Sequence, residues 1–277
     1  MNIGIRMHDT AAGTIEERAA MVKNQGFSCV HLALSKVIDP KYMDPAVATP
    51  GLATYLNKAL QGVDVAVLGC YLNLAHPDET KYQEILKKYV AHLQLCRWMN
   101  AGVVGTETGN PNAEYRYDPV ASHTDAALSL FIDRLHPVVD AAEKIGATIA
   151  IEPVYTHIVS DGKRARKVLD AIHSPNLKII FDPVNLLHPD NLQRRDAVLQ
   201  EAMELLGEEI VVVHMKDYHA TAEKLVACAP GLGEMDYDAV LRFCNERKPH
   251  VQMTLEDTKP DNAEAARLFL EKRATEV

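Results

Sequence analysis

Short apolar runs alternate with longer amphipathic segments from one end of the chain to the other. Most of these runs are almost continuously apolar, which is typical of strands covered on both faces, as in a parallel sheet. Their length and the turn-forming residues around them also favour strands. We therefore predict eight strands, at residues 2–6, 28–34, 65–74, 101–107, 148–152, 177–182, 210–217 and 251–257.

The segments between the strands have apolar residues at three- and four-residue spacings, which predicts helices. The first segment is also marked at both ends. Thr14 and Glu17 fit a capping box, and Gly26 stands where a helix commonly ends. We predict eight helices, at residues 14–26, 53–62, 82–93, 128–146, 164–172, 194–207, 237–246 and 263–272.

Strict alternation of strand and helix predicts repeated βαβ units and a parallel sheet. Eight units in 277 residues fit an α/β fold with one closed (β/α)₈ TIM barrel, and residues 1–277 are expected to form a single domain. A doubly wound open sheet is the alternative. No G-x-G-x-x-G follows the first strand and no G-x-x-x-x-G-K-[ST] occurs, so two phosphate-binding signatures of open sheets are missing. The barrel is therefore favoured.

The charge and the apolar content of the chain argue against two classes of partner, nucleic acids and membranes. A formal net charge of -9 argues against a nucleic-acid surface, which needs clustered Lys and Arg. The apolar runs are too short for a membrane span, and the first residues lack the pattern of a signal peptide. Five cysteines are scattered without a CxxC pair, as is typical of reduced thiols. We expect a cytoplasmic protein with no nucleic-acid or membrane partner.

In each of the last four predicted strands, an apolar run leads into a polar residue, namely Glu152, Asp182, His214 and Glu256. In a barrel the carboxyl ends of all strands open onto one mouth, so these residues would converge. One acidic residue at a strand end is usually a loop cap or part of a surface ion pair. Three carboxylates and one imidazole on four successive strands favour a site for a divalent ion such as Mn²⁺, Mg²⁺ or Co²⁺ over a thiolate zinc site.

Further polar residues follow other predicted strands near the same mouth. Glu107 closes the fourth strand, and we expect it to contact a substrate hydroxyl, to act as a second base or to form a salt bridge. His76 and His157 lie in loops and are candidates for substrate contact or proton transfer. Arg6 and His8, after the first strand, are weaker candidates.

Trp98 is predicted to lie in the core, on an apolar helix face, and Cys70 to be a buried strand residue without catalytic activity.

The motifs IEP, FDPVN, HMKD and TLED, on successive strands, resemble the sugar phosphate isomerase/epimerase superfamily, also called xylose isomerase-like. It includes ketose 3-epimerases, hydroxypyruvate isomerase, inosose dehydratase and an AP endonuclease branch. The segment PGLGEMDY, with Gly231, Gly233 and Asp236, is similar to a glycine-rich turn of that family. The resemblance covers essentially the whole chain.

The resemblance implies a divalent metal ion, most often Mn²⁺, with Mg²⁺, Co²⁺ or Zn²⁺ as alternatives. By position, its ligands would be Glu152, Asp182, His214 and Glu256. It also implies that Glu152 and Glu256 form an acid/base pair that removes a proton next to a carbonyl and returns one, through an enediolate.

The chain also departs from parts of the family. Asn185 and Ala220 stand where ketose 3-epimerases usually carry His and Arg. Lys216 lies in an H-x-K-D pattern that is more similar to the inosose dehydratase and related isomerase branches. Lys216 would meet a substrate oxygen or form a salt bridge to a carboxylate at the mouth. Asn185 also replaces a zinc ligand of the AP endonuclease branch, which argues against DNA repair.

The expected function is a metal-dependent isomerase or epimerase of a small sugar, sugar acid or polyol derivative. Glu152 and Glu256 are the expected catalytic residues, and the expected substrate contacts are His76, Glu107, His157, Asn185 and Lys216. One alternative is a dehydratase that uses the same site. Another is a non-catalytic sugar-binding barrel or a subunit of a larger assembly. Relatives often form dimers or tetramers, so a homo-oligomer is expected.

Overall fold

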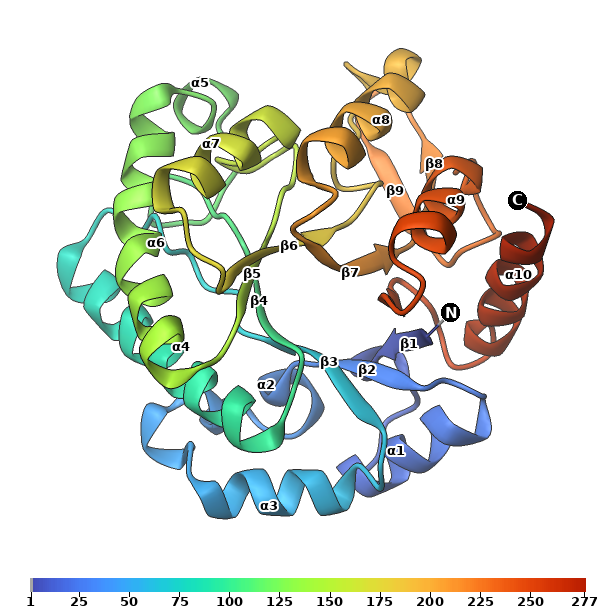
Figure 1. Ribbon diagram of the computed structural model, residues 1–277, viewed down its shortest axis with the longest axis horizontal. Helices are drawn as coiled ribbons and strands as arrows, with labels where there is room; N and C mark the ends of the chain where they lie inside the picture. The colour runs from blue at the N-terminus through green and yellow to red at the C-terminus, as the bar shows by residue number, and fades with distance from the viewer. Residues whose placement is uncertain (1) are drawn as a thin grey trace.

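The computed structural model describes residues 2–277. Eight parallel strands form a closed barrel in the order β1-β10-β7-β6-β5-β4-β3-β2 (Figure 1). Parallel pairing of β1 with both β10 and β2 closes the ring. The strands are β1 (Asn2–Arg6), β2 (Cys29–Leu32), β3 (Asp64–Gly69), β4 (Val103–Glu107), β5 (Ile149–Glu152), β6 (Leu177–Phe181), β7 (Ile210–Met215) and β10 (Gln252–Leu255). The predicted TIM barrel is confirmed.

One long helix follows each barrel strand and packs on the outside of the ring (Figure 1). At the first helix, Thr14 and Glu17 form the predicted capping box, and Gly26 has a positive φ of 79°. The outer helices are α1 (Ile15–Asn24), α3 (Pro50–Ala59), α4 (Glu79–Met99), α6 (Asp125–Ile145), α7 (Gly162–Ile172), α8 (Arg195–Leu206), α9 (Asp238–Arg247) and α10 (Ala263–Glu276).

Several connections contain additional short elements, so the predicted strict alternation of one strand and one helix is not complete. Short helical pieces lie between β2 and α3, after β1, before α6 and before α8. They are η1 (Met7–Asp9), α2 (Leu34–Val37), η2 (Pro40–Met43), η3 (Pro45–Val47), α5 (Pro119–Ser122) and η4 (Leu192–Arg194). An antiparallel hairpin of β8 (Asp217–Ala220) and β9 (Leu225–Cys228) follows β7 and lies between α8 and α9 in Figure 1. The apolar pattern alone had merged the start of this hairpin with the seventh strand.

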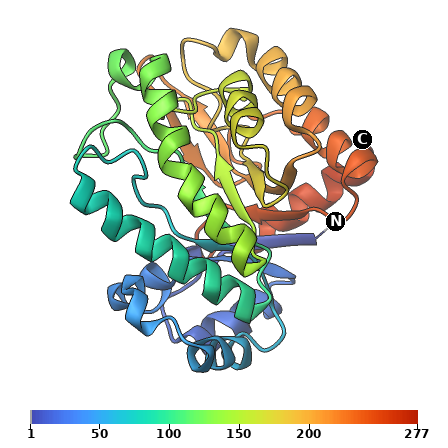
Figure 2. The same ribbon diagram turned by 60° about the vertical axis from the view of Figure 1, so that its left-hand side comes forward.

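The helices bury their apolar faces against the barrel and against each other. Figure 2 shows α4 and α6 side by side on the outer wall, where the two helices contact one another. Phe131 on α6 is fully buried. Trp98 on α4 is 41% exposed, so its predicted core position is wrong. It lies near the carboxyl end of its helix, on the side turned away from the buried stripe. None of the helices in residues 2–277 is long and apolar enough to cross a membrane.

Replacement of Phe131 by Ala should lower the free energy of unfolding by about 3–5 kcal/mol, because it leaves a cavity between α6 and the barrel. The matched change Trp98→Ala removes an aromatic ring from a half-exposed position and should cost about 1 kcal/mol or less. Urea denaturation of the two variants measures both values. Similar losses for both would contradict this difference in packing.

Candidate active site

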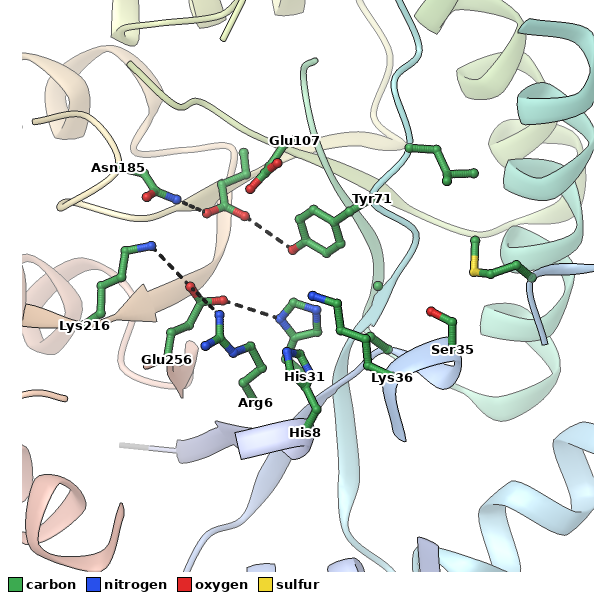
Figure 3. Close-up of a pocket in the computed structure, with 15 residues that line it drawn as sticks. Arg6, His8, His31, Ser35, Lys36, Tyr71, Glu107, Asn185, Lys216 and Glu256 are labelled. Atoms are coloured by element: carbon green, nitrogen blue, oxygen red, sulfur yellow. Dashed lines mark hydrogen bonds and ion pairs between the residues drawn. The ribbon is translucent and has the colours of Figure 1, made fainter. Parts of the chain in front are cut away.

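A cavity of about 330 Å³ opens at the carboxyl ends of the barrel strands. Its wall is strongly polar and comes from at least six strands or the loops that follow them. Residues that line it include Arg6, Tyr71, Glu107, Asn185 and Lys216 (Figure 3). The mouth is therefore where distant parts of the sequence meet, as the barrel predicts.

The four polar residues at the predicted strand ends all lie buried at this mouth. Glu152 is the last residue of β5, Asp182 directly follows β6, His214 lies in β7 and Glu256 directly follows β10. In the barrel order, β10 lies on one side of β7, and β6 and then β5 lie on the other. His214 is thus flanked by the two glutamates.

The contacts of the two glutamates differ. His214 Nδ1 lies 3.3 Å from Oε1 of Glu152 and 3.3 Å from Oε1 of Glu256. Neutral groups also contact Glu152: Asn185 Nδ2 donates to it at 2.6 Å and the Tyr71 hydroxyl at 3.3 Å.

Cations, in contrast, contact the second oxygen of Glu256. Lys216 Nζ lies 3.3 Å and Arg6 Nη1 lies 3.6 Å from its Oε2 (Figure 3). Burial alone would raise the pKa of Glu256, but His214 and the two cations hold it well below its usual range. Glu256 is thus kept ionised, whereas neutral donors orient Glu152.

Asp182 is fixed by the turn that follows it. Its Oδ1 accepts the backbone N–H groups of Val184 and Asn185, both at 2.9 Å. Pro183, between the strand and these donors, turns the chain back over the carboxylate. Burial raises the pKa of Asp182 to about 6, and Lys216, 2.8 Å from Oδ2, opposes that rise.

Lys216 forms the salt bridges that were one of its two expected roles. Burial alone would lower its pKa, but Asp182 and Glu256 raise it well above its usual range, so the ammonium stays charged. Its backbone carbonyl accepts a hydrogen bond from the Tyr237 hydroxyl at 2.9 Å. Because Lys216 also lines the cavity, substrate contact stays a prediction.

The glycine-rich turn is anchored to the residue after Lys216. Asp217 accepts backbone N–H groups from Gly231 at 3.0 Å and from Met235 at 2.8 Å. A side chain at Gly233 would collide with the Asp217 carboxylate and the Tyr218 carbonyl, so this position needs glycine. Asp236, in contrast, caps the backbone N–H of Asp238 at the start of α9.

The donor atoms at the mouth fit a divalent cation. Ligand atoms of Glu152, Asp182 and His214 lie within 4.8 Å of one another. Both ring nitrogens of His214 are buried without a hydrogen-bond partner in residues 2–277. Two carboxylates and an imidazole are a hard, mixed O/N set that suits Mn²⁺, Mg²⁺, Co²⁺ or Zn²⁺.

The other predicted contacts divide into two groups. Glu107 lines the cavity and accepts a hydrogen bond from the Tyr115 hydroxyl at 3.0 Å, and His157 Nδ1 lies 3.8 Å from Glu107. His157 is buried beside this pair, and burial lowers its pKa to about 4. His76 lies outside the group of residues that line the cavity, and its ring accepts the backbone N–H of Asp78.

Sequence reasoning missed His31 and Tyr71, and it ranked Arg6 too low. His31 lies inside β2, in the run CVHL, and its ring stacks on both Tyr71 and His214. It forms a second group with His214 and Glu256 whose ligand atoms lie within 4.8 Å of one another. The signal for His31 was a single polar residue within an otherwise apolar strand.

A family model described as xylose isomerase-like TIM barrel matches residues 19–273 of the chain. The chain belongs to this family. Among curated proteins, no significant match was found. The closed parallel barrel explains why the four strand-end residues meet, because it brings the carboxyl ends of all strands to one mouth.

Solved structures support the same fold at low sequence identity. The apo form of 3-keto-D-glucoside 4-epimerase YcjR from E. coli is 16% identical, with a TM-score of 0.77 and coverage of 98% of this chain and 99% of the other. The IolI protein with a bound zinc atom is 17% identical, with a TM-score of 0.73 and coverage of 100% and 97%. The probable 3-DHS dehydratase AsbF from Bacillus anthracis is 13% identical, with a TM-score of 0.72 and coverage of 98% and 99%.

His214 makes the stability of the chelator-treated protein depend on pH. Burial alone would lower its pKa, but Glu256 and Glu152 raise it to about 9 from the ordinary value of 6.5. A raised pKa gives stability that is complete below pH 6.5 and lost as pH rises through about 9. The loss should be about 3 kcal/mol, since each tenfold change in proton affinity corresponds to about 1.4 kcal/mol. Urea denaturation across this range measures it.

The variant His214→Gln should show a much flatter profile over the same pH range. His136→Gln, which changes an exposed histidine on α6, should keep the slope of the unmodified protein. Equal slopes in both variants would contradict the role assigned to His214.

Proposed function

We propose that the protein is a metal-dependent isomerase or epimerase that moves a proton next to the carbonyl of a small sugar, sugar acid or polyol derivative. The observation that carries this proposal is the placement of two buried glutamates, Glu152 and Glu256, at equal distances of 3.3 Å from His214 at one cavity. A cavity of about 330 Å³ is of the size that holds one small ligand. Structural neighbours described as 3-keto-D-glucoside 4-epimerase and D-psicose 3-epimerase support it.

Glu152, Asp182, His214 and Glu256 would hold the divalent ion. When bound, such an ion supplies a Lewis acid that polarises the substrate carbonyl and stabilises the negative charge of an enediolate. His214 must lose its proton to act as a ligand, and the carboxylates that raise its pKa are the groups whose charge the ion would balance. The neighbour IolI, described with a bound zinc atom, supports a metal ion in a protein of this fold.

The contacts of the two glutamates suggest different roles for them. Lys216 and Arg6 stabilise the ionised form of Glu256, which makes this carboxylate a weaker base. Glu152 accepts hydrogen bonds from the neutral Asn185 and Tyr71. We assign the first proton abstraction to Glu152. Because Glu256 is ionised, it would first have to take up a proton from water or from Lys216, 3.3 Å away, before it could return one to the opposite face of the substrate. Asn185 and Tyr71 would orient Glu152 toward the substrate carbon.

A dehydratase is the second candidate, and Glu107 favours it. This residue lines the cavity beside the glutamate pair, and burial raises its pKa, opposed by the Tyr115 hydrogen bond. A carboxyl group that keeps its proton at higher pH is suited to donate it to a leaving hydroxyl. The neighbour described as a probable 3-DHS dehydratase has the same fold.

Replacement of Glu152 by Gln should lower deuterium incorporation into substrate by about 10²-fold or more, because the general base is lost. The assay incubates Mn²⁺-saturated protein with D-tagatose, D-psicose or an inosose in D₂O, and NMR follows exchange at the carbon next to the carbonyl. Glu256→Gln should also lower exchange. Glu246→Gln, an exposed change on α9, should leave it unchanged.

Metal content is measured for every variant, because both glutamates are also expected ligands. Undiminished exchange in a metal-saturated Glu152→Gln protein would refute the assignment of the base. Loss of water from the inosose with formation of a dicarbonyl product would instead favour the dehydratase.

A further inference from the structure

His31 is a buried imidazole for which the residues described in the structure provide no hydrogen bond. The residue is 3% exposed, and neither Nδ1 nor Nε2 has a partner within residues 2–277. In its neutral form an imidazole has one ring nitrogen with a free lone pair, which can bind a cation. An unsatisfied buried polar group costs about 1–3 kcal/mol, and such a group in a folded protein commonly marks an ion or water that completes its contacts.

The ring of His31 is held tightly in one orientation. It stacks on Tyr71 with a centroid distance of 5.4 Å and on His214 with a distance of 5.3 Å. The ring also depends on Gly69 at the end of β3. A Cβ atom at Gly69 would lie 2.7 Å from His31 Nε2, so only glycine leaves room for the imidazole. The glycine at position 69 therefore leaves the space that the His31 ring occupies in the cavity wall.

The distances around His31 match those between ligands of one metal ion. With metal–ligand bonds of about 2.1 Å, two ligand atoms lie about 3.0 Å apart at a right angle and about 4.2 Å apart on opposite sides of the ion. His31 Nδ1 lies 3.8 Å from Glu256 Oε1, too far for a hydrogen bond. The same oxygen lies 3.3 Å from His214 Nδ1. Both distances fall inside the range for a shared ion.

The orientation of Glu256 supports the same arrangement. Its Oε2 faces the cations Lys216 and Arg6, whereas its Oε1 faces the ring of His31 (Figure 3). The same Oε1 also lies 3.3 Å from the ring of His214. Two buried ring nitrogens and a carboxylate oxygen thus lie close to one another. A cation at this point would satisfy all three.

We propose that His31 is a fifth donor of the metal centre, in addition to the four residues at strand ends. The inference rests on the metal site of the proposed function. A second imidazole changes the chemistry of the centre, because imidazole suits Zn²⁺ and Co²⁺ whereas carboxylates suit Mg²⁺ and Mn²⁺. His31 therefore shifts the preference of the site from Mn²⁺ toward Zn²⁺ and Co²⁺.

The first test measures metal affinity with the variants His31→Gln and His8→Gln. The metal-free proteins are titrated with Zn²⁺, Co²⁺ and Mn²⁺ in competition with a chromophoric chelator. His31→Gln should weaken Zn²⁺ and Co²⁺ binding by about tenfold or more, should weaken Mn²⁺ binding less, and should change the visible absorption spectrum of bound Co²⁺. His8 lines the same cavity and lies edge-on to His31, but belongs to neither donor group, so His8→Gln should preserve both properties.

The second test uses the unmodified protein and does not depend on how a variant folds. Each histidine ligand of Co²⁺ leaves one ring N–H that gives an exchangeable, strongly shifted proton signal in NMR. Two such signals are expected, from His214 and His31. A single signal, or unchanged affinities and spectrum in a folded His31→Gln protein, would overturn the inference.

Failure of the proposed function gives a different result. A protein with two histidine signals that shows no proton exchange and no dehydration with any substrate tested would retain His31 as a ligand while refuting the isomerase and dehydratase proposals. Exchange that proceeds with only one histidine signal would refute the role of His31 and leave the proposed function standing.

Discussion

Three buried carboxylates lie at the carboxyl end of the barrel and repel one another. The surrounding residues offset this repulsion with positive charges. Glu152, Asp182 and Glu256 are each almost fully removed from solvent. An unpaired charge in such a place costs several kcal/mol. The chain offsets this with its own positive charges, Lys216 between Asp182 and Glu256 and His214 between the two glutamates.

Much of the nearby structure serves to hold Lys216 in place. Tyr237 fixes its carbonyl from the start of α9, and Asp217 ties the glycine-rich turn to the strand end directly after it. The β8–β9 hairpin lies between these two segments in the sequence. The motifs HMKD and PGLGEMDY therefore contact each other and together hold the buried Lys216 in place. These contacts give the glycine-rich turn a structural role, without any direct contact of the turn with the cavity.

The fold and the strand-end residues could be predicted because both follow from patterns of regular period. Apolar runs indicated the strands, and barrel closure then required Glu152, Asp182, His214 and Glu256 to meet. His31 could not be found in this way, since its position inside β2 becomes meaningful only when Gly69 on the adjacent strand is seen to leave space for the ring. Trp98 was misplaced because apolar spacing indicates which face of a helix is buried but not how far around the helix that buried face extends.

Asn185 was expected to touch substrate, yet its strongest contact is with Glu152 at 2.6 Å. The difference bears on mechanism. A neutral amide orients the Glu152 carboxylate, whereas Glu256 lies beside the two cations Lys216 and Arg6. In the proposed metal centre, His31 would add a second imidazole on the side of Glu256. Apart from His214, Glu152 contacts only the neutral donors Asn185 and Tyr71, which supports the assignment of the first proton abstraction to this residue.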